Sequence, residues 1–426
     1  MRKLKPEHFT ALIFLSVITG IMLSVLFVFV SKKVKNAENP RHDVRIDWEK
    51  EYPFMNYVPG GGGGYKVSSF FYDYVKEKLE NYTSKELAGY YSYVESSKRY
   101  ENFLGWNMAP MSEYNAVMKM PCGQLTTYTE SRDVTYDALR TVSLSDFCRE
   151  RGIDFFYINA PKKVCIHEDK EVSGILDFSN QNTDNFLDIL GKNGVKYYDL
   201  RKTLHAEGMN HHGSFFPTDN HWTIETGFWA SRHILKILKD DYGWPVNLGV
   251  LSREKFRFKT YREHFLGAYG KKVTLVRAKP DDFTLITPKY SSSIRLSVPQ
   301  SGIDAEGDFS VMLNYSALEP KDFYGKNTYG TYNMHSSVIR TENMNISEGK
   351  KFLLIRDSFS GCVVPFVALG VKHVDAVDLR TFSGSIRSYI ASEKPDAVAV
   401  MYYAEMPGRT GAPYSSDTDR RLYDFR

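Results

Sequence analysis

Short apolar runs alternate with helix-spaced apolar positions along most of the chain. Strand-like runs lie at 153–158 and 195–198, and a helix-like stretch lies at 183–192. Thr223 is positioned to cap a helix that carries Phe228, Trp229, Ile234, Leu235 and Leu238. After a break, the alternation resumes with strand 351–355, helix 360–370, strand 373–378, helix 383–392 and strand 396–401. This pattern predicts an α/β fold with a parallel sheet and helices on both of its faces.

The break in the alternation spans about 244–349. This part is rich in Tyr, Gly, Ser and Pro, and it contains short β-prone runs such as 283–286 and 310–313. We predict a β-rich insertion here, packed near the active edge of the sheet.

The N-terminal part has a different character. Residues 9–30 carry no charge, and a helix of that length can cross a hydrocarbon core. We predict a basic N-terminus at 1–8 and an uncleaved transmembrane helix at 9–31. A juxtamembrane linker with a helical lead-in would follow at 32–110, before the catalytic domain at 111–426. A cleaved signal peptide is the alternative.

The charges that flank this predicted helix only weakly specify its orientation in the membrane. Arg2, Lys3 and Lys5 precede it, and Lys32, Lys33 and Lys35 follow it, so the positive-inside rule is nearly balanced. A short basic N-terminus before a large domain favours an N-terminus inside the cytoplasm. We therefore expect a single-pass protein of the cell membrane whose catalytic domain lies outside the cytoplasm.

Composition narrows the choice of function only slightly. A net charge of +4 over 426 residues does not point to nucleic acid. The four cysteines match no zinc-binding spacing; they allow three disulfide pairings if all are oxidised, and buried free thiols are an equal alternative.

Two motifs carry the candidate chemistry. Asp219 and His221 lie two residues apart, and a carboxylate bound to one imidazole nitrogen leaves the other free as a base. Ser358 follows a predicted buried strand, where parallel sheets gather their reacting groups. We predict an Asp219-His221-Ser358 triad in which the backbone N–H of Ser358 or Phe359 contributes to an oxyanion hole.

Other interpretations of these residues stay open. Ser358 could simply cap the helix predicted after it, and His221 could be a satisfied interior histidine. His211, His212, Asp219 and His221 could also bind zinc, although they lack a helical His-x-x-x-His spacing. We predict no metal ion and no cofactor.

The same motifs resemble the DHHW protein family, which is similar to the SGNH-like acyltransferases of exopolysaccharide acetylation. The run 218–223, Thr-Asp-Asn-His-Trp-Thr, matches the family signature except that Asn220 replaces a histidine. The run 354–359 matches the later strand-Gly-Asp-Ser-Phe/Tyr motif except that Arg356 replaces glycine. Further likenesses are the runs 160–163 and 377–380. The fold this implies is SGNH-hydrolase-like (flavodoxin-like).

The resemblance implies O-acetyl transfer to or from a cell-envelope polysaccharide, with a membrane-bound O-acyltransferase as the donor partner. Lys163, Arg356 and Arg380 are candidate contacts for an acidic sugar, although Lys163 and Arg380 could equally be solvated surface charges. Arg356 could instead crowd the site. A catalytically inactive polysaccharide-binding or assembly protein on the same fold is therefore the alternative function.

Overall fold

The chain divides into two compact units, Met1–Ser97 and Lys98–Arg426. The computed structural model describes Glu95, Ser96, Arg99 and residues 117–426, except 168–170, 173–174, 320, 333–335 and 413–414. The predicted transmembrane helix at 9–31 and most of the predicted lead-in at 32–110 lie outside the described residues. Within the described part of the chain, every helix is too short or too polar to span a bilayer.

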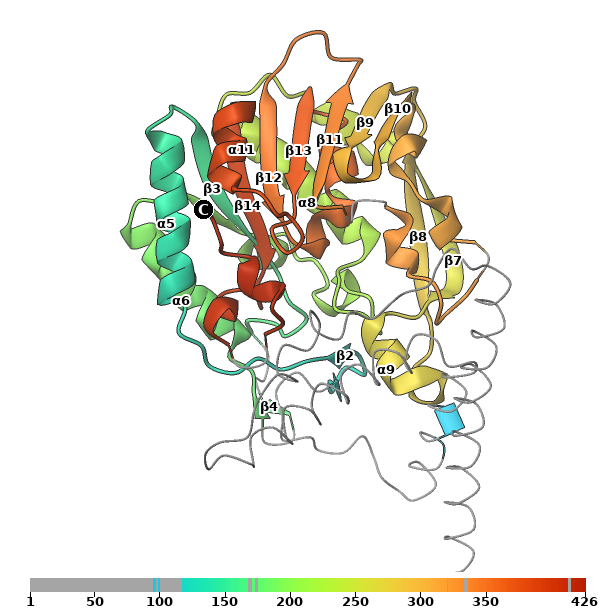
Figure 1. The fold of residues 1–426 in the computed structure, drawn as a ribbon. Coiled ribbons are helices and arrows are strands. Elements are labelled where there is room, and N and C mark those ends of the chain that lie inside the picture. The colour runs from blue at the N-terminus through green and yellow to red at the C-terminus, as the bar shows by residue number, and fades with distance from the viewer. Residues whose placement is uncertain are drawn as a thin grey trace, which may run out of the picture. The chain divides into compact units, whose positions relative to one another are not determined.

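An eight-stranded sheet forms the centre of the second unit (Figure 1). Five strands are parallel to one another, and three further strands extend one edge by antiparallel pairing. The parallel strands are β3 (Asp154–Ala160), β6 (Tyr197–Asp199), β12 (Lys351–Arg356), β13 (His373–Val377) and β14 (Ala397–Tyr403). The antiparallel strands are β9 (Ile294–Val298), β10 (Ile303–Gly307) and β11 (Val338–Asn343).

The central strands β12 and β14 are apolar over most of their length. All seven residues of β14 are buried, as are Phe352, Leu353, Leu354 and Ile355 of β12. Continuous apolar runs of this kind are expected where helices cover both faces of a sheet. Figure 1 shows α5 (Thr135–Arg149) and α11 (Ile386–Glu393) in front of the sheet and α8 (Ile224–Asp240) behind it.

The remaining elements surround this core. α6 (Ser179–Lys192) packs against α5, and α10 (Val364–Val367) packs against α8. The short helix α7 (Leu200–Ala206) contacts β3. β7 (Phe256–Phe265) and β8 (Asp281–Pro288) form a separate hairpin, joined by α9 (Ala268–Arg277). Two small hairpins complete the fold: β1 (Met118–Lys119) with β2 (Leu125–Thr126), and β4 (Glu171–Val172) with β5 (Ile175–Leu176).

The strand order differs from the flavodoxin-like order that we expected. Numbered along the chain, the five parallel strands lie in the order 2-1-5-3-4, because β14 occupies the position between β3 and β12. A flavodoxin-like sheet has the order 2-1-3-4-5. The carboxyl ends of all five strands still share one edge, so the segments after β3, β12, β13 and β14 lie close together.

Two local predictions, for 360–370 and 310–313, are wrong in detail, whereas the β-rich character predicted for 244–349 is confirmed. The predicted helix 360–370 is instead a 3₁₀ helix at Ser358–Cys362 followed by the single turn of α10, in which Pro365 lies at the start. The β-prone run 310–313 falls mainly in a 3₁₀ helix at Phe309–Met312, because the Asp308 carboxylate accepts the N–H of Ser310 and starts a turn. The segment 244–349 holds five strands, of which β9, β10 and β11 belong to the central sheet.

Candidate active site

Asp219 and His221 lie in a tight turn before α8. Phe215 and Trp222 form an antiparallel bridge across this turn, and the N–H of Phe216 donates to the carbonyl of His221. Thr223 then caps α8, as its sequence position predicts, by accepting the N–H of Thr226 on its side chain. The turn is therefore fixed at both of its ends.

The Asp219 carboxylate is buried, with 3% of the residue exposed, and accepts three hydrogen bonds. Oδ1 accepts the backbone N–H of His221 at 3.0 Å and lies 2.5 Å from His221 Nδ1. Oδ2 accepts the N–H of Ala268 at 2.6 Å. Burial by itself would raise the pKa of Asp219, but the charge and hydrogen bonds of His221 outweigh it and lower the pKa to about 2. Asp219 is therefore an ionised partner of the imidazole at neutral pH.

Ser358 meets this imidazole from the end of β12. Its Oγ lies 2.8 Å from His221 Nε2, although the two residues are 137 positions apart in the chain. The structure thus brings Asp219, His221 and Ser358 into one hydrogen-bonded line. Such a line holds the imidazole in the tautomer whose Nε2 can accept the serine proton.

Asp357 fixes the turn that carries Ser358. Its Oδ1 accepts the N–H of Phe359 at 2.9 Å, and its Oδ2 accepts the N–H of Tyr403 at 2.8 Å. Burial raises the pKa of Asp357 to about 6, although the nearby Arg380 charge opposes the rise. The carboxylate therefore joins the ends of β12 and β14 beneath the serine.

This capping corrects one predicted role. The N–H of Phe359 donates to Asp357 and is not available for an oxyanion. The N–H of Ser358 has no hydrogen-bond partner in the part of the chain that the structure describes, so it remains the candidate donor. When an aspartate caps the 3₁₀ helix that follows it, its carboxylate accepts the second N–H of the helix and leaves the first without a partner. Here the second N–H belongs to Phe359 and the first to Ser358.

Aromatic rings hold His221 on its other side. The Tyr329 ring stacks on the imidazole, with ring centroids 4.2 Å apart. Trp222 Nε1–H donates to the carbonyl of Phe359 at 3.0 Å, and Tyr329 O–H donates to the same oxygen at 3.3 Å. Sequence reasoning missed Tyr329, because it lies in a part of the chain without a motif.

Asp281 and Gly267, which sequence reasoning also missed, contact the turn that carries Asp219 and His221. The Asp281 carboxylate accepts the N–H and the hydroxyl of Thr218 at 2.9 and 2.7 Å. Gly267 lies so close that a Cβ there would be 2.2 Å from Asp219 Cβ and 2.6 Å from the carbonyl oxygen of Thr218. Close approach of backbone explains this glycine, and no local pattern marks it in the sequence.

Of the three predicted substrate contacts, two are buried structural cations. Lys163 is 1% exposed, and its Nζ donates to the carbonyls of Leu125 and Pro217 at 2.7 and 3.1 Å. Burial lowers its pKa to about 8, although Asp219 and Asp281 oppose this shift. A group enclosed in this way cannot reach a sugar, so the predicted contact is wrong.

Arg356 is also enclosed, with 0% of the residue exposed. It donates to the carbonyl of Ser336 at 2.8 Å and lies 3.8 Å from the Asp378 carboxylate. Its side chain therefore neither binds a sugar nor separates His221 from Ser358, which corrects both predictions for this residue. Arg380 keeps a partly exposed side chain while it forms a two-point ion pair with Asp378. Its predicted contact with substrate stays a prediction.

The predicted alternative of a zinc site does not form from its four residues. Among the described residues, the group of His, Cys, Asp or Glu side chains close enough to hold a metal ion consists of Cys165, His205 and His211. It includes neither Asp219 nor His221. None of the four cysteines, all of which lie in the described part of the chain, forms a disulfide bond.

Comparison with known proteins bears on the family resemblance and on the fold. Residues 135–280 match the family described as the SGNH hydrolase-like domain of the acetyltransferase AlgX, a range that includes Asp219 and His221. The resemblance to the SGNH-like acetyltransferases is confirmed. Among curated proteins, no match to the chain is found.

Solved structures show the same fold over most of the chain. PatB1 of Bacillus cereus is 19% identical with a TM-score of 0.58, and the alignment covers 72% of this chain and 99% of PatB1. A second PatB1 structure, with a sulfonyl adduct, gives a TM-score of 0.57 at 19% identity over 72% of this chain and 98% of that chain. A DHHW family protein from Eubacterium siraeum is 14% identical with a TM-score of 0.53, over 72% of this chain and 94% of that protein. At these identities the likeness establishes the SGNH-like α/β fold.

Proposed function

We propose that the protein is a membrane-anchored serine O-acyltransferase that acts outside the cytoplasm on a cell-envelope polysaccharide, with acetyl as the acyl group. One observation carries the proposal: His221 bridges the buried Asp219 carboxylate and the Ser358 hydroxyl at 2.5 and 2.8 Å. The resemblance to polysaccharide O-acetyltransferases supports the choice of substrate. The uncharged stretch 9–30 supports the anchor.

The proposed reaction has two halves. In the first, Ser358 Oγ attacks the acyl carbonyl while His221 Nε2 takes its proton, and the donor's leaving group departs with that proton. In the second, His221 removes a proton from an acceptor hydroxyl, which attacks the acyl-serine and releases Ser358. Asp219 stabilises the imidazolium that forms in each half, and the N–H of Ser358 supports the oxyanion.

The identity of the acceptor decides between transferase and esterase. A sugar hydroxyl makes the enzyme a transferase, whereas water makes it an esterase, and both use the same three residues. A membrane-bound O-acyltransferase is the proposed donor partner, and the resemblance to exopolysaccharide acetylation proteins supports this choice.

A non-catalytic binding or assembly role is the second candidate, and Arg356 is the observation that favoured it. The side chain of Arg356 is buried against Ser336 and Asp378 and leaves the contact between His221 and Ser358 intact. This arrangement supports the catalytic candidate over the binding one.

The test uses the full-length protein in detergent. We expect an arylsulfonyl fluoride to label Ser358, as mass spectrometry of the peptide would show, and to stop p-nitrophenol release from p-nitrophenyl acetate. Ser358→Ala should lose both the label and the turnover. Ser360→Ala, in the same 3₁₀ helix, is the matched control. The Ser360 hydroxyl donates to the Asp357 carbonyl and not to His221, so this variant should keep both the label and the turnover. Wild-type turnover by Ser358→Ala would rule out the proposed nucleophile.

A further inference from the structure

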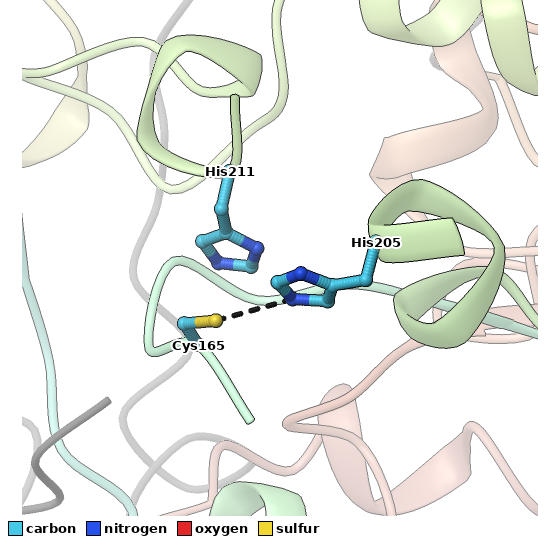
Figure 2. A group of neighbouring side chains, drawn as sticks. All are labelled: Cys165, His205 and His211. Carbon is cyan, nitrogen blue, oxygen red and sulfur yellow. Dashed lines mark hydrogen bonds between the residues drawn. The ribbon is translucent and has the colours of Figure 1, made fainter. Parts of the chain in front are cut away.

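Three side chains of the kinds that bind metal ions come from separate segments and lie close together at the loop that follows β3. Cys165 lies in that loop, His205 lies in α7, and His211 precedes the turn that carries His221. Each offers one ligand atom, and these atoms all lie within 4.8 Å of one another. Figure 2 shows the Cys165 sulfur directed at the His205 ring, with the His211 ring beside them.

The sulfur and the first imidazole are already in contact. Cys165 Sγ lies 3.1 Å from His205 Nε2, and the backbone N–H of His167 donates to the sulfur at 3.5 Å. Cys165 is buried, so its thiol is shielded from bulk solvent. The N–H of His167 supports the sulfur in this position, and the thiolate that forms when the thiol proton leaves is the form that binds metal ions.

His211 is oriented as metal-bound histidines usually are. Its Nε2–H donates to the backbone carbonyls of Lys162 and Lys163 at 2.9 and 3.0 Å. This tautomer leaves Nδ1 with a bare lone pair, and Nδ1 is buried, in a residue only 8% exposed, with no hydrogen-bond partner among the residues that the structure describes. A metal-binding imidazole typically donates its other ring N–H to a backbone carbonyl or a carboxylate, which fixes the ring. A buried lone pair without a partner costs free energy unless a ligand uses it.

The donor set selects the kind of ion. One thiolate and two imidazoles suit a borderline-soft transition metal, and the cluster has no carboxylate oxygen of the kind that Ca²⁺ or Mg²⁺ needs. Zinc accepts Cys and His ligands in a tetrahedron whose ligand atoms lie roughly 3.5 Å apart. In the structure these atoms lie within 4.8 Å of one another, so they must approach by up to about 1.3 Å, and the stacked rings of His205 and His211 must rotate.

We propose that Cys165, His205 and His211 bind one Zn²⁺ ion, with a water molecule in the fourth position. Binding releases the Cys165 thiol proton to solvent. The ion joins the loop after β3 to the segment that leads into the Asp219–His221 turn. Lys163 makes a second link between the same two segments, through its hydrogen bond to the carbonyl of Pro217. The site is thus a structural clip beside the catalytic histidine and takes no part in the acyl transfer.

The test measures zinc directly on the full-length protein in detergent. After treatment with a chelator and removal of that chelator, the protein is titrated with Zn²⁺ against a chromophoric competitor. We expect one zinc per chain and a higher melting temperature with zinc. Cys165→Ser and His205→Gln should weaken binding by more than about 100-fold, because even outer-shell partners change metal affinity by 10–100-fold.

Matched controls separate this site from chance binding. Cys122→Ser removes an exposed thiol, and His212→Gln removes the imidazole next to His211, whose ring it contacts. Both should bind zinc as the wild type does. Equal affinity in all four variants would mean an adventitious ion only and would overturn the proposal.

Co²⁺ gives a readout from the wild-type protein itself, which does not depend on how well any variant folds. The wild-type protein loaded with Co²⁺ should show a thiolate-to-metal charge-transfer band in the near ultraviolet, and Cys165→Ser should not. Absence of that band from the wild type, or binding of Cu²⁺ without binding of Zn²⁺, would sink the zinc assignment. Each of these outcomes is independent of whether Ser358 is the nucleophile.

Discussion

His211 and His221 lie ten residues apart in one segment, yet their rings have opposite surroundings. His221 has a carboxylate on Nδ1 and a hydroxyl on Nε2. His211 has two neutral carbonyls on Nε2, and its Nδ1 has no hydrogen-bond partner within the described part of the chain. A carboxylate stabilises the imidazolium that a general base must become, whereas neutral carbonyls do not. Burial, with the neighbouring His212, lowers the pKa of His211 to about 4, so that ring stays neutral. A charged hydrogen-bond partner thus suits His221 to act as a general base, and neutral partners suit His211 to bind a metal ion.

Replacing the charged partner should break this contrast most strongly. Asp219→Asn gives His221 a neutral partner, as His211 has, and favours the wrong tautomer. We expect kcat to fall about 10⁴-fold, with zinc content unchanged. Hydrolysis of p-nitrophenyl acetate and metal analysis of the same sample measure both quantities. Asp240→Asn, an exposed change on α8, is the control, and full activity in Asp219→Asn would contradict the assigned role.

Asp281, which holds Thr218 in the catalytic turn, should make the stability of the protein depend on pH. Burial raises the pKa of Asp281 to about 7 from 3.8, so the folded state keeps a proton that the unfolded state releases. The free energy of unfolding should therefore fall as pH rises from about 4 to 7, by up to about 4 kcal/mol from this residue. Asp357, whose pKa burial raises to about 6, acts in the same direction. Denaturant titrations at both ends of this range should show a smaller fall in Asp281→Asn. An unchanged fall would mean that Asp281 is ionised in the folded protein.

Displacing the carboxylate without removing it tests how exact the geometry must be. A methyl group at Gly267 would lie 2.2 Å from Asp219 Cβ, so Asp219 must move. We expect Gly267→Ala to lose about 10²-fold in kcat, the usual effect of a misplacement of about 1 Å. Gly411→Ala, where nothing lies within 4 Å, is the control for a glycine substitution. Wild-type kcat in Gly267→Ala would show that the turn tolerates the shift.

The smallest expected effect concerns the ring that stacks on His221. Tyr329→Phe keeps the stacking but removes the hydroxyl that donates to the Phe359 carbonyl. We expect a loss of about 1 kcal/mol of stability and less than about tenfold in kcat. Tyr290→Phe removes a comparable hydrogen bond, to the Val250 carbonyl, and should leave kcat unchanged. Equal kinetic effects of the two changes would remove any special role for Tyr329.

Sequence reasoning found the parts of the site that are encoded locally. Asp219 and His221 share one turn, and Ser358 follows an apolar strand, so periodicity and spacing were enough to pair them. Arg356 and Lys163 show the limit of such reasoning. Their burial depends on Asp378 and on the carbonyls of Leu125 and Pro217, which only the folded chain brings near.

The cluster of Cys165, His205 and His211 could not be predicted for a related reason. Its members come from two loops and a helix, with intervals that fit no zinc-binding pattern. The extension of the sheet by β9, β10 and β11 was equally hidden, because strand pairing is a long-range property that β propensity does not specify. Tertiary packing decides each of these features.

The central position of β14 has a consequence for biogenesis. Of the described strands it is the last to leave the ribosome, yet it separates β3 from β12 and supplies the Tyr403 N–H that holds Asp357. Until β14 has been synthesised, β3 and β12 lack the strand that pairs with both of them, so the catalytic edge of the sheet is incomplete. The catalytic edge can therefore form only after β14 has been synthesised. A nonsense mutation between residues 378 and 396 would leave β3 and β12 without the strand that lies between them, and chaperones and proteases would meet these unpaired strands.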